Sequence, residues 1–161
     1  MDVKRDSMDV DVLIVGAGPS GLATAIHLAD LIEDARSKGT LRGAPTSDEF
    51  TLMVIEKSAE IGDHMLSGAV VDPKGLDELI PDWKEKEAPL SARVGEDALC
   101  FLTRRSRFKV PFLPPVMHNH GYFVASLQQF MRWLGRIAEE KGIEVFTGMA
   151  GAGPIIEEGA L

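Results

Sequence analysis

Two features of this chain have the residue types and order to bind a dinucleotide. One is a glycine-rich turn, Gly16-Ala17-Gly18-Pro19-Ser20-Gly21, which has the pattern G-x-G-x-x-G, and the other is the acidic residue Glu56. A pyrophosphate binds backbone N–H groups at a helix N-terminus, where the helix dipole favours an anion. Glycines at these positions allow a sharp turn, close approach of the phosphates and tight helix packing, and the acid accepts hydrogen bonds from a ribose.

The elements needed to position these residues are also present. An apolar run at residues 12–15 precedes the turn, a helical apolar period covers residues 22–32, and a second apolar run at 52–55 ends on Glu56. The order is strand, glycine turn, helix, strand and acid, which predicts a dinucleotide-binding βαβ unit over residues 10–56. The alternative is a glycine-rich turn that binds no ligand.

One departure from the simple pattern lies between the helix and the acid. The usual gap to the acid is about 20 residues, and Gly21 and Glu56 are further apart than that. Residues 40–49 contain Gly43, Pro45 and Ser47, which are typical of a surface loop. We therefore expect an insertion there that leaves both ends of the unit intact.

The composition excludes several classes of protein. The 161 residues suffice for one domain, and the net charge of -8 argues against non-specific nucleic-acid binding. Cys100 is the only cysteine of this chain, which excludes a disulfide framework or an all-cysteine metal site within it. We expect no membrane-spanning helix, because no apolar run reaches 18 residues. Met1 to Asp9 are too short and polar for a secretory or mitochondrial leader.

The later part of the chain predicts a hairpin and a further helix and strand. Alternating apolar residues around a polar turn predict a hairpin over residues 97–112 with a basic tip, which is either a solvated end or a docking site for an acidic partner or a lipid head group. Within residues 126–146, a helical period over 126–141 predicts a helix, and Ile143-Glu144-Val145-Phe146 predicts a third strand. A parallel third strand after a helix is what a doubly wound sheet requires. His118 and His120 lack companion ligands at metal-site spacing, so we expect no metal there.

Two other stretches allow two interpretations each. Residues 57–69 are rich in small residues and could run along a bound cofactor or form an ordinary loop. The apolar residues Leu76, Leu79, Ile80 and Trp83 follow helical spacing, and Pro81 limits the length of the helix. Their apolar face either packs on the core or lies in a membrane interface.

Several segments together resemble the electron transfer flavoprotein–ubiquinone oxidoreductase family, and the resemblance extends from residue 11 to residue 148. The glycine turn and the stretch from Glu56 to Gly62 are common to many FAD enzymes. The far more specific segments are Leu66-Ser67-Gly68-Ala69 and Pro81-Asp82-Trp83-Lys84-Glu85-Lys86. Ala88-Pro89-Leu90 and Asn119-His120-Gly121 also resemble the family.

The resemblance implies a Rossmann-like FAD-binding domain with a parallel sheet, an inserted β-hairpin and an amphipathic surface helix. That family uses one FAD and one 4Fe–4S cluster, takes electrons from reduced electron transfer flavoprotein and passes them to ubiquinone. Its members lie peripherally on a membrane, which is the inner membrane in mitochondria. The missing leader favours a bacterial protein on the cytoplasmic face of the cell membrane.

The resemblance also implies roles for particular residues, although it assigns no catalytic residue in this chain. The glycine turn would hold the FAD pyrophosphate and Glu56 the ribose, and residues 71–90 would contact the membrane. The implied cofactor-binding residues are Gly16, Ala17, Gly18, Pro19, Ser20, Gly21, Glu56, Lys57, Gly62, His64, Ser67 and Gly68. The implied membrane-contacting residues are Leu76, Leu79, Ile80 and Trp83.

The chain departs from the family pattern in what it lacks. The cluster needs four cysteines, and this chain has only Cys100. The quinone site and the second half of the FAD domain would lie beyond Leu161, so we expect this chain to be the N-terminal part of such a domain. The alternatives are another FAD-dependent oxidoreductase, of the geranylgeranyl reductase or monooxygenase type, and a truncated, non-catalytic nucleotide-binding chain.

Overall fold

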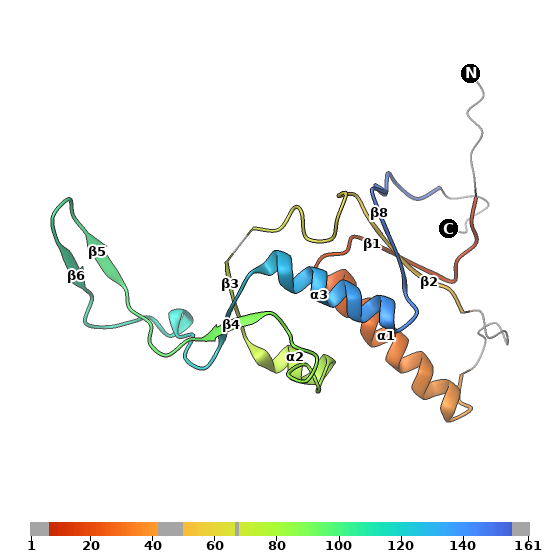
Figure 1. Cartoon of the computed structure of the whole chain (residues 1–161), viewed down its shortest axis with the longest axis horizontal. Coiled ribbons are helices and arrows are strands. Elements are labelled where there is room, and N and C mark those ends of the chain that lie inside the picture. The colour runs from red at the N-terminus through yellow and green to blue at the C-terminus, as the bar shows by residue number, and fades with distance from the viewer. Residues whose placement is uncertain (1–6, 42–49, 67, 156–161) are drawn as a thin grey trace, which may run out of the picture. The chain divides into compact units, whose positions relative to one another are not determined.

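The computed structural model of the chain describes residues 7–41, 50–66 and 68–155 (Figure 1). Most of the expected insertion at 40–49, and Ser67, therefore lie outside the described residues. The chain divides into two compact units, the first formed by Met1–His64 with Met131–Leu161 and the second by Met65–Phe130. A length typical of one domain did not predict this division.

The first unit contains a parallel sheet of three strands. They are β1 (Val12–Val15), β2 (Leu52–Glu56) and β8 (Glu144–Thr147), arranged in the order β1-β2-β8. Val12 pairs with Leu52 and Val54 with Val145, and both pairings are parallel. Parallel strands are usually buried on both faces and read as continuous apolar runs, which is why the runs at 12–15 and 52–55 could be recognised. The predicted α/β class with a parallel sheet is confirmed.

Two long helices accompany this sheet. Helix α1 (Pro19–Ser37) connects β1 to β2, and α3 (Leu127–Glu140) precedes β8. Pro19 stands at the first helical position of α1, where a missing N–H costs nothing. Beyond α3, Gly142 has φ +78°, a conformation that glycine adopts readily and that ends a helix. The most deeply buried large side chains are Leu22, Ile26, Val54 and Met131.

The second unit contains an antiparallel sheet and a separate hairpin. Strands β3 (Ala69–Val71), β7 (Phe123–Ala125) and β4 (Leu90–Arg93) form the sheet in the order β3-β7-β4. The predicted hairpin is present as β5 (Cys100–Leu102) and β6 (Arg107–Lys109), which pair antiparallel. The unit also contains helix α2 (Pro73–Leu79) and the 3₁₀ helix η1 (Pro115–Met117).

The apolar side of α2 faces the interior of the second unit. Leu76, Ile80 and Trp83 are buried and Leu79 is half-buried. The Trp83 ring meets Phe123 of β7 edge to face at 5.6 Å, and its Nε1 donates to Asp77 Oδ1 at 2.7 Å. The burial of Leu76, Ile80 and Trp83 argues against membrane contact by these three side chains, because side chains that fill the unit's own core do not face lipid. Membrane contact by the half-buried Leu79 stays a prediction.

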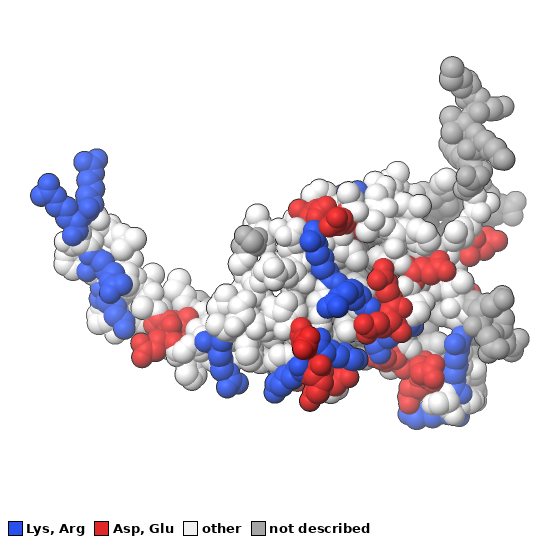
Figure 2. Space-filling model, in the orientation of Figure 1, with Lys and Arg blue, Asp and Glu red and all other residues white. Residues whose placement is uncertain are grey.

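Two further surface properties bear on the sequence-based expectations. Within the described ranges, the structure contains no helix with the length and apolarity to cross a bilayer. The hairpin carries the exposed basic residues Arg104, Arg105, Arg107 and Lys109, and Figure 2 shows Lys and Arg side chains gathered on it. Phe101 and Phe108 on the same hairpin are also largely exposed.

Candidate functional site

The glycine turn connects β1 to α1 at the carboxyl edge of the parallel sheet. Gly16 has φ +105°, which side-chain-bearing residues rarely adopt, and its N–H donates to the Ile55 carbonyl at 2.7 Å. An ideal Cβ built on Gly21 would lie 1.9 Å from the Gly16 carbonyl oxygen. The first and last glycines of the motif are therefore required by backbone conformation and by close packing, respectively.

The N-terminus of α1 presents backbone donors just after this turn. Gly18 is the N-cap residue, and no side chain caps the helix. The Leu22 N–H donates to the Gly18 carbonyl at 3.0 Å, so the N–H groups of Ser20 and Gly21 come before that helical hydrogen bond. These donors, together with the helix dipole, make the turn a suitable binding place for a phosphate group.

Glu56, the last residue of β2, reaches the glycine turn through its carboxylate. Its Oε2 accepts from the Ala17 N–H at 2.8 Å, and its Oε1 accepts from the Ser58 N–H at 3.0 Å. The structure therefore brings together the two features that the sequence separated by a helix and a loop. The acid and the turn lie at the same edge of the sheet because β1 and β2 are parallel and adjacent.

The environment of Glu56 keeps its carboxyl group ionised. Burial raises the pKa of this group, but hydrogen bonds from the Ser58 N–H, the Ala17 N–H and the Ser58 hydroxyl, with the charge of His64, outweigh burial and hold the pKa below its ordinary value. Glu56 is thus a hydrogen-bond acceptor at neutral pH. An acceptor beside a phosphate-binding turn matches the requirement for holding ribose hydroxyls.

Ser58 links Glu56 to the loop that follows, and the sequence did not single it out. Its side chain is buried, and its hydroxyl lies 2.8 Å from both Glu56 Oε1 and the Glu60 carbonyl oxygen. A hydroxyl has one hydrogen, so these two acceptors compete for it. The only available signal in the sequence was a serine two residues after the acid, which favours local turns.

Strand β8 continues its contact with β2 beyond the regular strand. The Met149 N–H donates to the Glu56 carbonyl at 2.8 Å, and the Gly148 N–H donates to the Ser58 carbonyl at 2.7 Å. At Gly151, a Cβ would lie 2.7 Å from Val15 Cγ1, so residues after β8 run close over the end of β1. The carboxyl ends of all three strands therefore border the candidate site.

The other residues that the family resemblance implies for FAD binding belong partly to the first unit and partly to the second. In the first unit, Lys57 and His64 are exposed, and Gly62 is buried with φ +88°. Gly68 belongs to the second unit and also has φ +88°.

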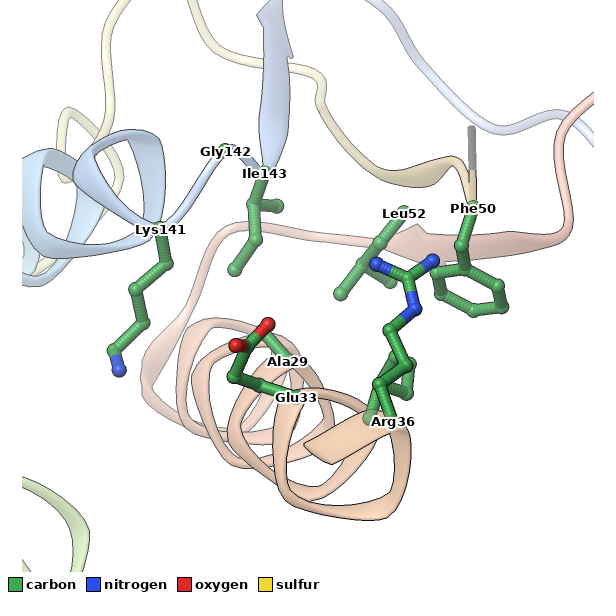
Figure 3. Close-up of a pocket in the computed structure, with 9 residues that line it drawn as sticks. Ala29, Glu33, Arg36, Phe50, Leu52, Lys141, Gly142 and Ile143 are labelled. Carbon is green, nitrogen blue, oxygen red and sulfur yellow. The ribbon is translucent and has the colours of Figure 1, made fainter. Parts of the chain in front are cut away.

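A cavity lies at the opposite edge of the sheet, near the amino-terminal ends of β2 and β8. It has a volume of about 100 Å³, and Figure 3 shows Glu33 and Arg36 rising from α1 toward its strand residues. Its lining residues are Ala29, Ile32, Glu33, Arg36, Phe50, Leu52, Lys141, Gly142 and Ile143. Ligands of open α/β sheets bind at the carboxyl edge, so this cavity is not the candidate site.

The two histidines considered as metal ligands contact backbone carbonyls. His118 Nε2 lies 3.1 Å from the Leu113 carbonyl oxygen, and His120 Nδ1 lies 2.6 Å from that of Gly95. No group of three or more His, Cys, Asp or Glu side chains suited to a metal occurs within the part of the chain that the structure describes.

Comparison with known proteins gives strong matches to one kind of enzyme. No family model matches the chain. It is 49% identical over 146 residues to the mitochondrial electron transfer flavoprotein-ubiquinone oxidoreductase of Dictyostelium discoideum, a match covering 91% of this chain and 22% of the relative. It is 41% identical over 159 residues to the Pseudomonas aeruginosa enzyme of the same name, covering 97% of this chain and 27% of the relative.

Solved structures match the fold at lower sequence identity. A geranylgeranyl bacteriochlorophyll reductase-like protein from Thermoplasma acidophilum has a TM-score of 0.56 and 19% identity, covering 92% of this chain and 32% of that protein. A mutant 2-methyl-3-hydroxypyridine-5-carboxylic acid oxygenase has a TM-score of 0.53 and 13% identity, covering 86% and 31%. These likenesses establish the fold alone, and the curated relatives above are about four times as long as the matched region.

Proposed function

Because this chain is homologous to the N-terminal portion of electron transfer flavoprotein–ubiquinone oxidoreductases, we propose that it forms the FAD-binding part of such an enzyme. The observation that carries the proposal is the hydrogen bond from the Ala17 N–H to the Glu56 carboxylate at 2.8 Å. This contact assembles a phosphate-binding turn and a ribose-binding acid at the carboxyl edge of a parallel sheet.

The residues present fit the adenosine diphosphate portion of FAD. The N–H groups of Gly18, Ser20 and Gly21 would hold the pyrophosphate, and Gly21 leaves no side chain between the helix and the turn. Each carboxylate oxygen accepts up to two hydrogen bonds. Oε1 of Glu56 accepts from the Ser58 N–H and shares the Ser58 hydroxyl with the Glu60 carbonyl, whereas Oε2 accepts from the Ala17 N–H. Oε2 is therefore the oxygen that we assign to a ribose hydroxyl.

The loop after Glu56 supplies the other proposed contacts. We assign Lys57, Gly62, His64, Ser67 and Gly68 to the FAD site on the basis of the family resemblance. When bound, FAD supplies the redox chemistry, and this chain's residues bind it, orient it and set its electrostatic surroundings. None of these residues is assigned a proton-transfer role.

The activity of the whole enzyme is proposed from the relatives. We infer that the longer protein takes electrons from reduced electron transfer flavoprotein and passes them to ubiquinone. Its 4Fe–4S cluster would require cysteines outside this chain, since only Cys100 is present here. We propose peripheral attachment to a membrane, on the cytoplasmic face in a bacterium. The buried α2 side chains are not part of that attachment.

The test of this proposal is a titration of the purified chain with FAD, followed by flavin fluorescence. We expect binding at a ratio of one to one, and Glu56→Gln should weaken it by about 10- to 100-fold, because hydrogen bonds to charged groups contribute roughly 1.5–3 kcal/mol. The control is Glu78→Gln, which removes the charge of an exposed side chain on α2. Absence of FAD binding by the well-folded chain, or preferential binding of NAD, would contradict the proposal.

A further inference from the structure

A single arginine on α3 holds the loop that follows Ser58. Arg132 Nη2 lies 2.6 Å from Glu60 Oε2 and 3.2 Å from Asp63 Oδ1, and its Nε donates to the Ile61 carbonyl at 3.2 Å. All these residues belong to the first unit. One guanidinium thus contacts three of the four residues from 60 to 63, which we call the clamped loop. The flat, multi-donor shape of arginine suits this task, and lysine provides no equivalent geometry.

An apolar contact beside Arg132 holds the same loop. A Cβ built on Gly135 would lie 2.4 Å from Ile61 Cδ1, so the Ile61 side chain occupies the space that a side chain at position 135 would need. Gly135 lies three residues after Arg132, hence on the same face of α3. A cavity of about 260 Å³ borders this contact and is also lined by Arg136.

The clamped loop is connected to the candidate cofactor site by consecutive hydrogen bonds. Arg132 contacts Glu60, the Glu60 carbonyl lies within hydrogen-bond distance of the Ser58 hydroxyl, and that hydroxyl also contacts Glu56 Oε1. The Glu60 N–H donates to Asp63 Oδ2 at 3.2 Å, which closes the loop on itself. Movement of Glu60 away from α3 would therefore alter the partner of Ser58 and, through it, the orientation of the Glu56 carboxylate.

We propose that Arg132 is a positioning residue for the FAD site and acts through Glu60 and Ser58 on Glu56. This inference rests on the proposed function. The arginine and its partners are substantially exposed, and exposed ion pairs contribute little to overall stability. Its loss is therefore expected to change cofactor affinity more than the unfolding transition.

The experiment compares FAD affinities of the chain and five variants by fluorescence titration, with circular dichroism to verify folding. Arg132→Gln should raise the Kd for FAD about three- to tenfold, the range expected from losing weak ion pairs and charge-assisted hydrogen bonds. Arg132→Lys should give an intermediate value. Arg136→Gln is the matched control, because it removes the same charge one helical turn away and should leave the Kd within a factor of two.

Two further readouts distinguish positioning from a general structural effect. The double variant Glu60→Arg with Arg132→Glu should recover most of the affinity that Arg132→Glu alone loses. The difference between the chain and Arg132→Gln should decrease in high salt, because salt screens exposed charges. Recovery by the charge exchange with an unchanged unfolding midpoint would support the proposal.

The outcomes separate this inference from the proposed function. If the unsubstituted chain binds FAD and Arg132→Gln and Arg132→Lys bind it equally well, the positioning role is overturned and the proposed function stands. If Arg136→Gln weakens binding as much as Arg132→Gln, the effect is one of net charge and the inference is also overturned. If the folded, unsubstituted chain binds no FAD, the proposed function fails and the inference fails with it.

Discussion

Replacing Gly21 by alanine tests the geometry of the glycine turn most directly. The added Cβ would lie 1.9 Å from the Gly16 oxygen, 3.2 Å from its carbonyl carbon and 3.4 Å from Ile14 Cγ2. Ordinary van der Waals contact begins at 3.4 Å, so the turn and the helix must separate by 3.4 minus 1.9, or 1.5 Å, along that direction. The Gly16 carbonyl cannot rotate freely, because it shares a peptide plane with the Ala17 N–H, which donates to Glu56 Oε2 at 2.8 Å.

The expected cost has two opposing parts. Forcing extra volume into a packed site costs about 1–3 kcal/mol, and alanine is favoured over glycine within a helix by about 1 kcal/mol. We therefore expect Gly21→Ala to lower the free energy of unfolding by up to about 2 kcal/mol. The effect on FAD should be larger, because displaced N–H donors lose hydrogen bonds to a charged pyrophosphate worth roughly 1.5–3 kcal/mol each. At least a tenfold increase in Kd follows.

The assay combines urea denaturation with FAD titration on three variants. Gly75→Ala in α2 is the control, because a Cβ there meets nothing within 4 Å, and it should be neutral or slightly stabilising. Gly16→Ala also meets nothing within 4 Å but has φ +105°, so it isolates backbone strain from steric clash. If Gly21→Ala unfolds and binds FAD like the unsubstituted chain, the close packing of helix on turn is refuted.

Three other predictions follow from individual contacts. The pKa of Glu56 is lower in the folded chain than in the unfolded chain, so the ionised carboxylate stabilises the fold. This stabilisation is complete above the ordinary glutamate pKa of about 4.3 and is lost as the pH falls below it. The difference in unfolding free energy between the chain and Glu56→Gln, measured by denaturant titration, should therefore decrease on acidification. Trp83→Phe should cost about 0.5–1.5 kcal/mol through the lost hydrogen bond to Asp77, whereas Trp83→Ala should cost about 3–5 kcal/mol; equal costs in thermal unfolding would contradict the buried position. Asp97 accepts hydrogen bonds from the Asn119 backbone N–H at 2.7 Å and from the Asn119 side-chain amide at 3.0 Å. Because these bonds join the two chain segments that flank the β5–β6 hairpin, Asp97→Ala should increase the rate of proteolysis in the hairpin relative to the unsubstituted chain. An unchanged rate would show that these bonds do not stabilise the hairpin.

The parts of the fold that the sequence predicted are those with a local physical cause. The glycine turn is constrained by its own backbone and by Gly16 and Gly21, which lie five residues apart. Apolar runs predicted β1, β2 and β8, as is typical of strands in a parallel sheet. The structure buries Leu52, Met53 and Val54 of β2, whereas Leu13 and Val15 of β1 are exposed. The position of Glu56 beside the turn followed from the adjacency of two parallel strands that one helix connects.

The α2 segment shows why helical spacing alone could not decide between core packing and membrane contact. Helical spacing at Leu76, Ile80 and Trp83 indicates that one face is apolar, but it carries no information about what covers that face. The covering group includes Phe123, which lies 40 residues later in the chain and meets Trp83 at 5.6 Å. A partner at such a sequence separation leaves no periodic pattern, so core packing and a membrane interface could not be separated from the sequence.

Arg132 escaped prediction for the same physical reason, and its case shows how the site depends on distant residues. It lies 72 residues from Glu60 and 69 from Asp63. The sequence pattern of α3 alone indicates only a solvent-exposed arginine at this position. The motif residues can form the turn by themselves, but they do not determine where the Glu56 carboxylate points. That orientation depends on Ala17 on one side and on Ser58 on the other, and Ser58 in turn depends on the clamped loop. In the proposed site, the glycine motif would determine where a dinucleotide binds, and the contact between α3 and the clamped loop would determine how firmly Glu56 is held.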